Sequence, residues 1–303
     1  MAEYLQSLPA GTPLPLFSLS TGQYLDPGLL CEDMQHQSGV VTLFVDAPPL
    51  GEPEPEPEPE PTPISEEVEP VFLQPSTRST IAADDRRRVA TTCQGSPDEE
   101  VLVRLAVSIT RGDLKTLQAR EWLNDKIING YMDWINRRDL ATHGQRRTIY
   151  AFSCFFYSQL SVQRYSYARV HNWTNEIDVF ELERLLFPIH VKKKNHWCLA
   201  VINLKAQRFE YYDSLGYSNT QCLPRLRRWL QDESQDKHER AYSLAEWTDF
   251  QQKEKSQRNN YDCGVFTARA AECVARDVPL DFTQEDISSL RILMSVQLLD
   301  GTL

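Results

Sequence analysis

The chain has 303 residues, of which 41% are hydrophobic and 10% aromatic, and its formal net charge is -11. This composition is sufficient for a folded core and predicts one or two domains. No dense basic stripe argues for nucleic-acid binding, and no apolar run reaches the length of a membrane span. Because the first residues also lack the positive region of a secretory signal, we expect a soluble intracellular protein.

The first hundred residues differ in composition from the rest. They hold 18 acidic and four basic side chains and 15 of the 18 prolines. Glu and Pro alternate over residues 52–61, which predicts an extended, solvated segment, because proline lacks a backbone donor and like charges repel. We therefore expect residues 1–97 to be a disordered, acidic, Pro/Glu-rich region. Within it, residues 40–45 could be a strand or a partner-binding segment, and residues 86–88 a solvated charge cluster or part of a nuclear import signal.

From about residue 98 the apolar spacing becomes regular, which predicts a folded domain over residues 98–303. A helix is predicted at 124–138, beginning at Asn124 or Asp125 and ending near Arg137 and Arg138. Further predicted elements are strands at 197–202 and 208–212, joined by a hairpin loop at 203–207, and helices at 223–231 and 263–275. Helices that flank a modest sheet indicate an α+β architecture.

The seven cysteines are spread along the chain without CxxC spacing, at positions 31, 93, 154, 198, 222, 263 and 273. An odd number without paired spacing predicts free thiols in a reducing compartment, not a disulfide framework or a zinc site. We expect neither a metal nor an organic cofactor. Most of the thiols are expected to be structural and buried, among them Cys198, on the strand face opposite Trp197.

One cysteine, Cys263, stands where a helix should begin, downstream of a histidine and an aspartate. His196 opens the first predicted strand and Asp213 follows the second, so a hairpin of this length brings the two together. A cysteine nucleophile needs an imidazole to take its proton and a carboxylate to orient that imidazole. Taken singly, His196 could be a solvated strand end and Asp213 a turn residue, but their coincidence favours a catalytic triad.

Other residues suit the surroundings of such a nucleophile. A helix N-terminus favours a thiolate at Cys263, because it carries partial positive charge and free N–H groups. Gln257 can donate from its side chain to a developing oxyanion, together with the backbone N–H of Cys263. Trp122 precedes the capped start of a helix, and Trp197 adjoins the predicted base. Their rings belong either to the core or to a narrow slot for glycine backbone.

Six blocks of the sequence, in this order, resemble the sentrin/SUMO-specific protease family of ubiquitin-like-protein-specific cysteine proteases (peptidase clan CE). The blocks are residues 121–129 (EWLNDKIIN), 155–157 (FFY), 188–190 (PIH), 196–197 (HW), 212–214 (YDS) and 260–266 (NYDCGVF). Residues 110–114 (TRGDL) and 229–234 (WLQDES) look closest to the vertebrate SUMO protease branch. The resemblance covers about residues 98–303.

The resemblance implies a papain-like cysteine protease fold with helices around a mixed sheet. It implies a SUMO-specific thiol protease that cleaves after the C-terminal Gly-Gly of the modifier, in deconjugation, precursor maturation or both. The implied partners are SUMO or SUMO-conjugated proteins, with no nucleic acid and no membrane, for a monomer in the nucleus and/or the cytoplasm.

The family's motifs also imply a role for single residues. The catalytic group consists of the base His196, its orienting Asp213, the nucleophile Cys263 and the oxyanion donor Gln257. The group that binds the modifier consists of Trp122 and Trp197, which would enclose the Gly-Gly tail, and Asp125, which would contact the modifier.

The chain departs from the family's pattern at residues 191–195, where the spacing before His196 is longer. We expect the extra lysines, Lys192–Lys194, in a solvent-facing loop near the rim of the active site, with an effect on contacts to the modifier. Two other classes of function stay open. One is a related enzyme, either a NEDD8- or ubiquitin-directed isopeptidase or an acetyltransferase, although the Trp122 and Trp197 pair argues against an acyl-CoA substrate. The other is a catalytically inactive SUMO-binding module, against which the intact triad argues.

Overall fold

The computed structural model describes residues 16–17, 24–25, 81–102 and 107–301. The first two ranges are a pair of short antiparallel strands, β1 (Leu16–Phe17) and β2 (Tyr24–Leu25), in the unit Met1–Pro70. All other described elements belong to the unit Val71–Leu303, here called the main unit. The segments singled out at 40–45 and 52–61 lie outside the described residues.

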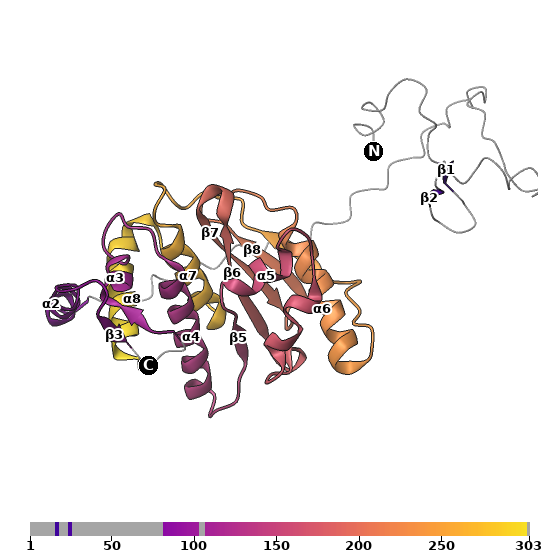
Figure 1. Cartoon of the computed structure of the whole chain (residues 1–303), viewed down its shortest axis with the longest axis horizontal. Helices are drawn as coiled ribbons and strands as arrows, with labels where there is room; N and C mark the ends of the chain where they lie inside the picture. Colours follow the sequence, from indigo (N-terminus) through magenta and orange to yellow (C-terminus); the bar gives the residue numbers. More distant parts are fainter. Residues whose placement is uncertain (1–15, 18–23, 26–80, 103–106, 302–303) are drawn as a thin grey trace, which may run out of the picture. The chain divides into compact units, whose positions relative to one another are not determined.

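A mixed five-stranded sheet in the order β5-β6-β7-β8-β9 organises the main unit (Figure 1). Its strands are β5 (Ile149–Ala151), β6 (Arg184–Val191), β7 (His196–Asn203), β8 (Arg208–Tyr212) and β9 (Thr248–Gln251). The three central strands are antiparallel, and each outer strand is parallel to its neighbour. Leu199 of β7 pairs with Tyr212, the last residue of β8, so the chain that follows β8 runs alongside the first residues of β7.

Helices cover both faces of this sheet (Figure 1). On one side lie α4 (Asp125–Thr142), α7 (Cys263–Ala275) and α8 (Ile287–Asp300), and on the other α5 (Phe155–Ser161) and α6 (Cys222–His238). Side chains alternate across a strand, so β7 feeds two cores. Trp197, Leu199 and Val201 join the first core, and Cys198, Ala200 and Ile202 the second. The predicted α+β class is confirmed.

Shorter elements complete the main unit. β3 (Glu100–Leu102) pairs with β4 (Ile109–Thr110), which leads into α3 (Arg111–Lys115). The described residues also form five 3-10 segments: η3 (Tyr167–Arg169), η4 (His171–Thr174), η5 (Val179–Glu181), η6 (Lys192–Lys194) and η7 (Gln284–Asp286).

 

The 3-10 segment that matters for the site is η6, which joins β6 to β7. As expected, Lys192 and Lys194 lie exposed in this connection.

Most predicted elements are confirmed, with shifted ends. The strand at 208–212 and the helix at 263–275 have the predicted bounds, and the strand at 197–202 is one residue longer at each end. α4 begins as predicted, since Asn124 Oδ1 accepts a hydrogen bond from the Ile127 N–H at 3.0 Å. The predicted end near residue 138 is wrong, because α4 continues to Thr142, and the helix predicted at 223–231 is the longer α6.

The region expected to be disordered contains one described helix, α2 (Ala83–Thr92). It lies against α8, where Arg88 forms an ion pair with Asp300 at 2.6 Å. Val89 packs against the first core and Cys93, just past the helix, is buried in it. The expectation of disorder therefore does not hold for this part of residues 1–97.

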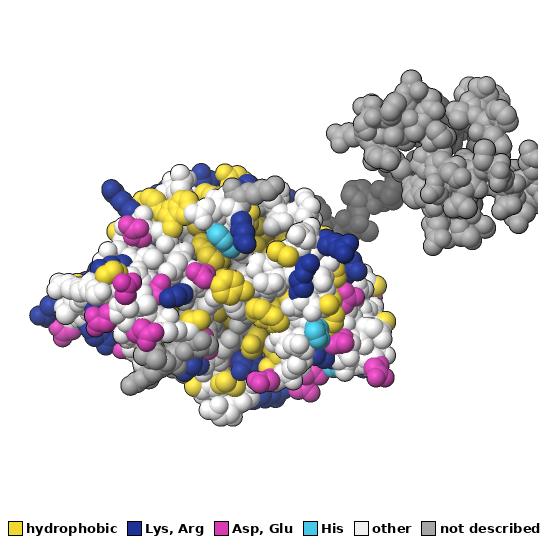
Figure 2. All heavy atoms as spheres, viewed as in Figure 1, with side chains coloured by type: hydrophobic (Ala, Val, Ile, Leu, Met, Phe, Trp, Pro, Cys, Tyr) yellow, Lys and Arg dark blue, Asp and Glu magenta, His cyan; other side chains and the backbone are white. Residues whose placement is uncertain are grey.

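The surface of the main unit is mixed in character. On the face shown in Figure 2, hydrophobic side chains gather over the middle, and most charged ones lie around them. The exposed large hydrophobic residues are Trp122, Phe155, Val162, Tyr217, Phe250 and Leu280. Among the described residues, no helix is both long enough and apolar enough to cross a bilayer.

Candidate active site

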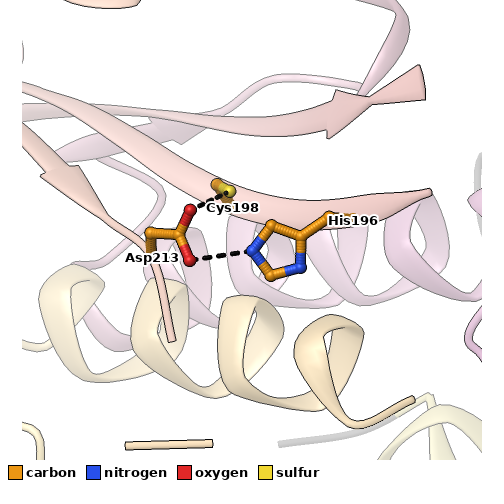
Figure 3. A group of neighbouring side chains, drawn as sticks. All are labelled: His196, Cys198 and Asp213. Atoms are coloured by element: carbon orange, nitrogen blue, oxygen red, sulfur yellow. Dashed lines mark hydrogen bonds and ion pairs between the residues drawn. The ribbon is translucent and has the colours of Figure 1, made fainter. Parts of the chain in front are cut away.

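The β7–β8 hairpin brings His196 and Asp213 together, as predicted. Leu199 of β7 pairs with Tyr212 of β8 in antiparallel register. The next residue, Asp213, therefore lies alongside the first residues of β7. The Nε2 of His196 lies 2.8 Å from Oδ1 of Asp213, and both residues are buried. The N–H of Leu215 donates to the same oxygen at 2.8 Å. Figure 3 shows the other ring nitrogen of His196 turned away from Asp213.

The second oxygen of Asp213 has a partner that the sequence did not reveal. The Cys198 thiol donates to Oδ2 at 3.2 Å, and Cys198 is fully buried (Figure 3). Its predicted place on the face opposite Trp197 is confirmed, but its contact with the carboxylate was missed. The hairpin register was the available signal, since Cys198 precedes the residue that pairs with the end of β8.

The pKa values of this pair move apart. Burial lowers the pKa of His196, but the hydrogen bond to Asp213 and the contacts with the thiols of Cys198 and Cys263 outweigh it, so the pKa rises above the ordinary 6.5. Burial raises the pKa of Asp213, yet the hydrogen bond and charge of His196 and the Leu215 N–H bring it below its ordinary value. The arrangement favours an imidazolium beside a carboxylate.

Cys263 completes the group. It is the first residue of α7, as predicted, and its thiol lies close enough to His196 to help raise the pKa of the imidazole. Gly264 lets α7 begin close to the segment that contains Leu123, because a Cβ at position 264 would lie 2.8 Å from Cβ of Leu123. The structure therefore brings the three predicted triad residues together.

A buried ion pair anchors the start of α7. The guanidinium of Arg291 in α8 donates to Oδ1 of Asp262 at 2.7 and 3.2 Å. Oδ2 of Asp262 accepts from the side chains of Asn259 and Gln284 at 2.6 and 2.8 Å. Arg291 also donates to the carbonyl oxygens of Thr116, Gln118 and Glu121. One side chain thus joins the residue before α7 to the segment that leads to Trp122.

Gln257 is fully buried and held on both sides of its amide. Its Oε1 accepts from the Ser214 hydroxyl at 2.6 Å, and its Nε2 donates to the carbonyl oxygen of Asn259 at 2.6 Å. An amide nitrogen carries two hydrogens, and the other contact of Nε2, to Asn259 Oδ1, is long at 3.5 Å. That leaves one N–H with donor capacity. Sequence reasoning missed Ser214 as the residue that fixes this amide.

The predicted slot residues come from adjacent segments. Trp197 is buried, donates from Nε1 to the carbonyl oxygen of Leu123 at 3.0 Å and stacks on His190 at 4.5 Å between ring centroids. Trp122, next to Leu123, is 41% exposed. Asp125 opens α4 and is half-buried, and no other described side chain forms a hydrogen bond or ion pair with it. A carboxylate and an exposed indole are therefore available for a partner.

The same cluster contains metal-ligating atoms. One atom each of His196, Cys198 and Asp213 lies within 4.8 Å of the other two. The Asp213 oxygens already accept from the other two side chains, so hydrogen bonding accounts for the arrangement.

Comparisons with known proteins agree with this geometry. Residues 121–300 match the family described as the Ulp1 protease family, C-terminal catalytic domain. The chain belongs to the Ulp1 protease family. A sentrin-specific protease of Caenorhabditis elegans is 37% identical over 210 residues, covering 69% of this chain and 29% of that protein. Sentrin-specific protease 2 of Mus musculus is 37% identical over 208 residues, covering 68% of this chain and 34% of that protein.

A solved structure gives the same fold for this Ulp1-family domain. The C-terminal Ulp1 protease domain in complex with Smt3, the yeast ortholog of SUMO, is 26% identical with a TM-score of 0.64. The match covers 73% of this chain and 96% of that one. The chain spans about a third of the length of the two curated relatives above. The predicted family and fold are confirmed.

Proposed function

We propose that this chain is a SUMO-specific thiol protease that cleaves after the C-terminal Gly-Gly of the modifier. The observation that carries the proposal is the buried His196–Asp213 pair, whose imidazole has the thiol of Cys263 near it at the start of α7. Membership of the Ulp1 protease family supports it, as does the complex of Ulp1 with Smt3.

The proposed reaction begins at sulfur. The Cys263 thiol gives its proton to Nδ1 of His196, because Nε2 is bonded to Asp213, and the thiolate attacks the carbonyl carbon of the last glycine. The resulting oxyanion accepts hydrogen bonds from the free N–H of Gln257 and from the backbone N–H of Cys263. Collapse of this intermediate breaks the C–N bond, and the leaving amine takes the proton from His196. Water then attacks the thioester, with His196 as base.

The modifier would reach the sulfur through the proposed slot between Trp122 and Trp197. Glycine has no side chain, so two indoles can close on its backbone and exclude larger residues. The exposed Trp122 and the half-buried Asp125 both lie where the chain enters α4 and would contact the modifier's body. Leaving groups include a substrate lysine and a C-terminal peptide.

The test uses modifiers that carry a C-terminal aminomethylcoumarin. The full chain should release the dye from SUMO and not from NEDD8 or ubiquitin, and Cys263→Ala should abolish release while keeping SUMO binding. Cys273→Ala is the matched control, because this buried thiol lies in the same helix. A SUMO vinyl sulfone should label Cys263 alone. Preference for NEDD8 or ubiquitin, or SUMO binding without any turnover, would reject the proposal in favour of one of the other two functions.

A further inference from the structure

Four exposed lysines, here called the basic rim, lie in two loops near the turn that follows Asp213. Lys192 and Lys194 belong to η6, and Lys253 and Lys255 follow β9. Within the described part of the chain, no carboxylate forms an ion pair with any of these four side chains. The loop after β9 also carries one exposed carboxylate, Glu254, between its two lysines, so the two loops together keep an excess of positive charge.

The rim reaches the proposed base through one aromatic residue. The ammonium nitrogen of Lys194 lies 3.7 Å from the ring centroid of Tyr217, a cation–π contact. The same tyrosine ring meets the imidazole of His196 edge-on, with 6.3 Å between ring centroids. Tyr217 is 48% exposed, so a molecule that approaches His196 from solvent can contact it.

The loop that carries Lys194 is fixed to the proposed slot. Asn195 ends η6 in the left-handed conformation, with φ 45°, and its Oδ1 lies 3.1 Å from Nε2 of His190. His190 in turn stacks on Trp197. These contacts hold the lysines of η6 beside both the base and the Gly-Gly slot.

The second loop packs against the turn that carries Tyr217. A Cβ at Gly216, where φ is 73°, would lie 2.9 Å from the carbonyl oxygen of Lys253 and 3.6 Å from the backbone nitrogen of Lys255. Gln251 at the end of β9 also donates to the carbonyl oxygen of Tyr217 at 3.3 Å. The two lysine loops therefore border the same turn.

We infer that the basic rim selects conjugates whose target lysine is flanked by acidic residues. This inference rests on the proposed function. In that reaction the leaving amine must come within hydrogen-bond reach of His196, so the target's residues next to the lysine pass over Tyr217 and between the two lysine loops. Acidic side chains there would meet unpaired ammonium groups, which favours their binding over neutral ones.

The experiment compares two conjugates in which SUMO is joined to a peptide lysine through an isopeptide bond. In one peptide Asp and Glu flank the lysine, and in the other Asn and Gln replace them. The wild-type chain should show a higher kcat/KM for the acidic peptide. In the double variant Lys192→Gln with Lys194→Gln, this preference should fall about three- to tenfold, as expected for two exposed charge contacts. Raising the salt concentration should also reduce the wild-type preference.

The control Lys205→Gln removes the same charge from the connection between β7 and β8, at the far end of β7 from His196, and should keep the preference. Equal rates on both peptides in the wild type, or an unchanged preference in the double variant, would overturn the inference. The proposed function would still stand if the wild type cleaved SUMO–aminomethylcoumarin. Absence of that turnover would reject the function, and the inference with it.

Discussion

Asp213 accepts hydrogen bonds on both carboxylate oxygens, and this determines which residues control the imidazole. Oδ1 accepts from His196 and from the Leu215 N–H, and Oδ2 accepts from the Cys198 thiol. Rotation of the carboxylate away from His196 would break contacts at both oxygens. The orientation of the proposed base thus depends on a fourth side chain, Cys198, in addition to the predicted triad.

Replacing Cys198 by Ala is expected to lower kcat/KM for SUMO–aminomethylcoumarin about five- to thirtyfold, because a hydrogen bond to a charged group contributes about 1–2 kcal/mol. Cys198→Ser keeps a donor and should recover most of the rate. Cys222→Ala, which removes another fully buried thiol from the same core, is the control for a cavity effect. Equal loss in the Ala and Ser variants at position 198 would show that packing, not donation, is responsible.

Asp213→Asn is expected to destabilise the protein to an extent that depends on pH. The folded pKa of His196 is above its unfolded value near 6.5, so this stabilisation is fully present below that pH and declines as pH rises. The folded pKa of Asp213 is below its ordinary 3.8, so its contribution is present above that pH and declines as pH falls. The loss in free energy of unfolding should therefore be largest between about pH 4 and 6.5.

Denaturant unfolding of wild type and variant across pH measures this difference directly. His196→Gln is the companion variant, since it removes the other partner of the same hydrogen bond. A difference between wild type and Asp213→Asn that grows as pH rises above 6.5 would contradict the assigned direction of the His196 pKa.

At the scale of elements, α8 positions the start of α7, where the proposed nucleophile lies, although α8 contributes no predicted site residue. Its Arg291 is bonded to Asp262, the residue before Cys263, and to three carbonyl groups of the segment that leads to Trp122. Arg291 and Asp262 are both buried. Removing one partner of a buried pair leaves the other charged and unpaired, which is costly.

Arg291→Met should lower the free energy of unfolding by about 3–5 kcal/mol. It should also slow SUMO–aminomethylcoumarin cleavage, because α7 and the Trp122 segment lose a shared anchor. The control is Arg137→Met, which breaks the more exposed pair with Asp133 on α4 and should cost at most about 1 kcal/mol. A similar small loss in both variants, measured by urea unfolding, would contradict the anchoring role.

The sequence predicted elements best where one local pattern decides them. The β7–β8 hairpin and α7 were predicted because alternating side chains and a helix start can each be recognised from a few neighbouring residues. β6 was missed, since its apolar run contains Pro188, which argues against a central strand. In the structure β5 pairs only with Arg184 to Leu186, so Pro188 lies beyond that partner and its missing donor is tolerated. How far β5 extends along β6 depends on the tertiary structure and cannot be predicted from the sequence of β6.

For the site too, features that depend on local sequence could be predicted, and features that depend on tertiary contacts could not. The grouping of His196, Asp213 and Cys263 could be predicted because each residue stands at the end or start of an element, while their catalytic roles stay predictions from the family's motifs. Cys198, Ser214 and Arg291 could not, because each acts through a side-chain contact that depends on register or on packing between distant segments. A buried thiol in a strand and an arginine in a mostly apolar helix give no local signal of such contacts.

At the scale of the whole molecule, the boundary of the folded domain at 97/98 stays a prediction. Upstream of it, α2 lies on α8, Val89 packs against the first core and Cys93 is buried there. Burying two such side chains stabilises a fold by about 1–3 kcal/mol. The segment 81–97 should therefore contribute to the stability of the protease domain.

A fragment of residues 81–303 is accordingly expected to melt about 2–12 °C above a fragment of residues 98–303, given a shift of about 2–4 °C per kcal/mol for a domain of about 200 residues. Differential scanning calorimetry of the two fragments measures this. Within the longer fragment, Val89→Ser combined with Cys93→Ser should remove most of the gain, because it removes the buried apolar contacts and keeps α2 in the chain. Arg88→Ala should have a small effect, since its pair with Asp300 is exposed to solvent. Equal melting temperatures of the two fragments would place α2 outside the cooperative unit.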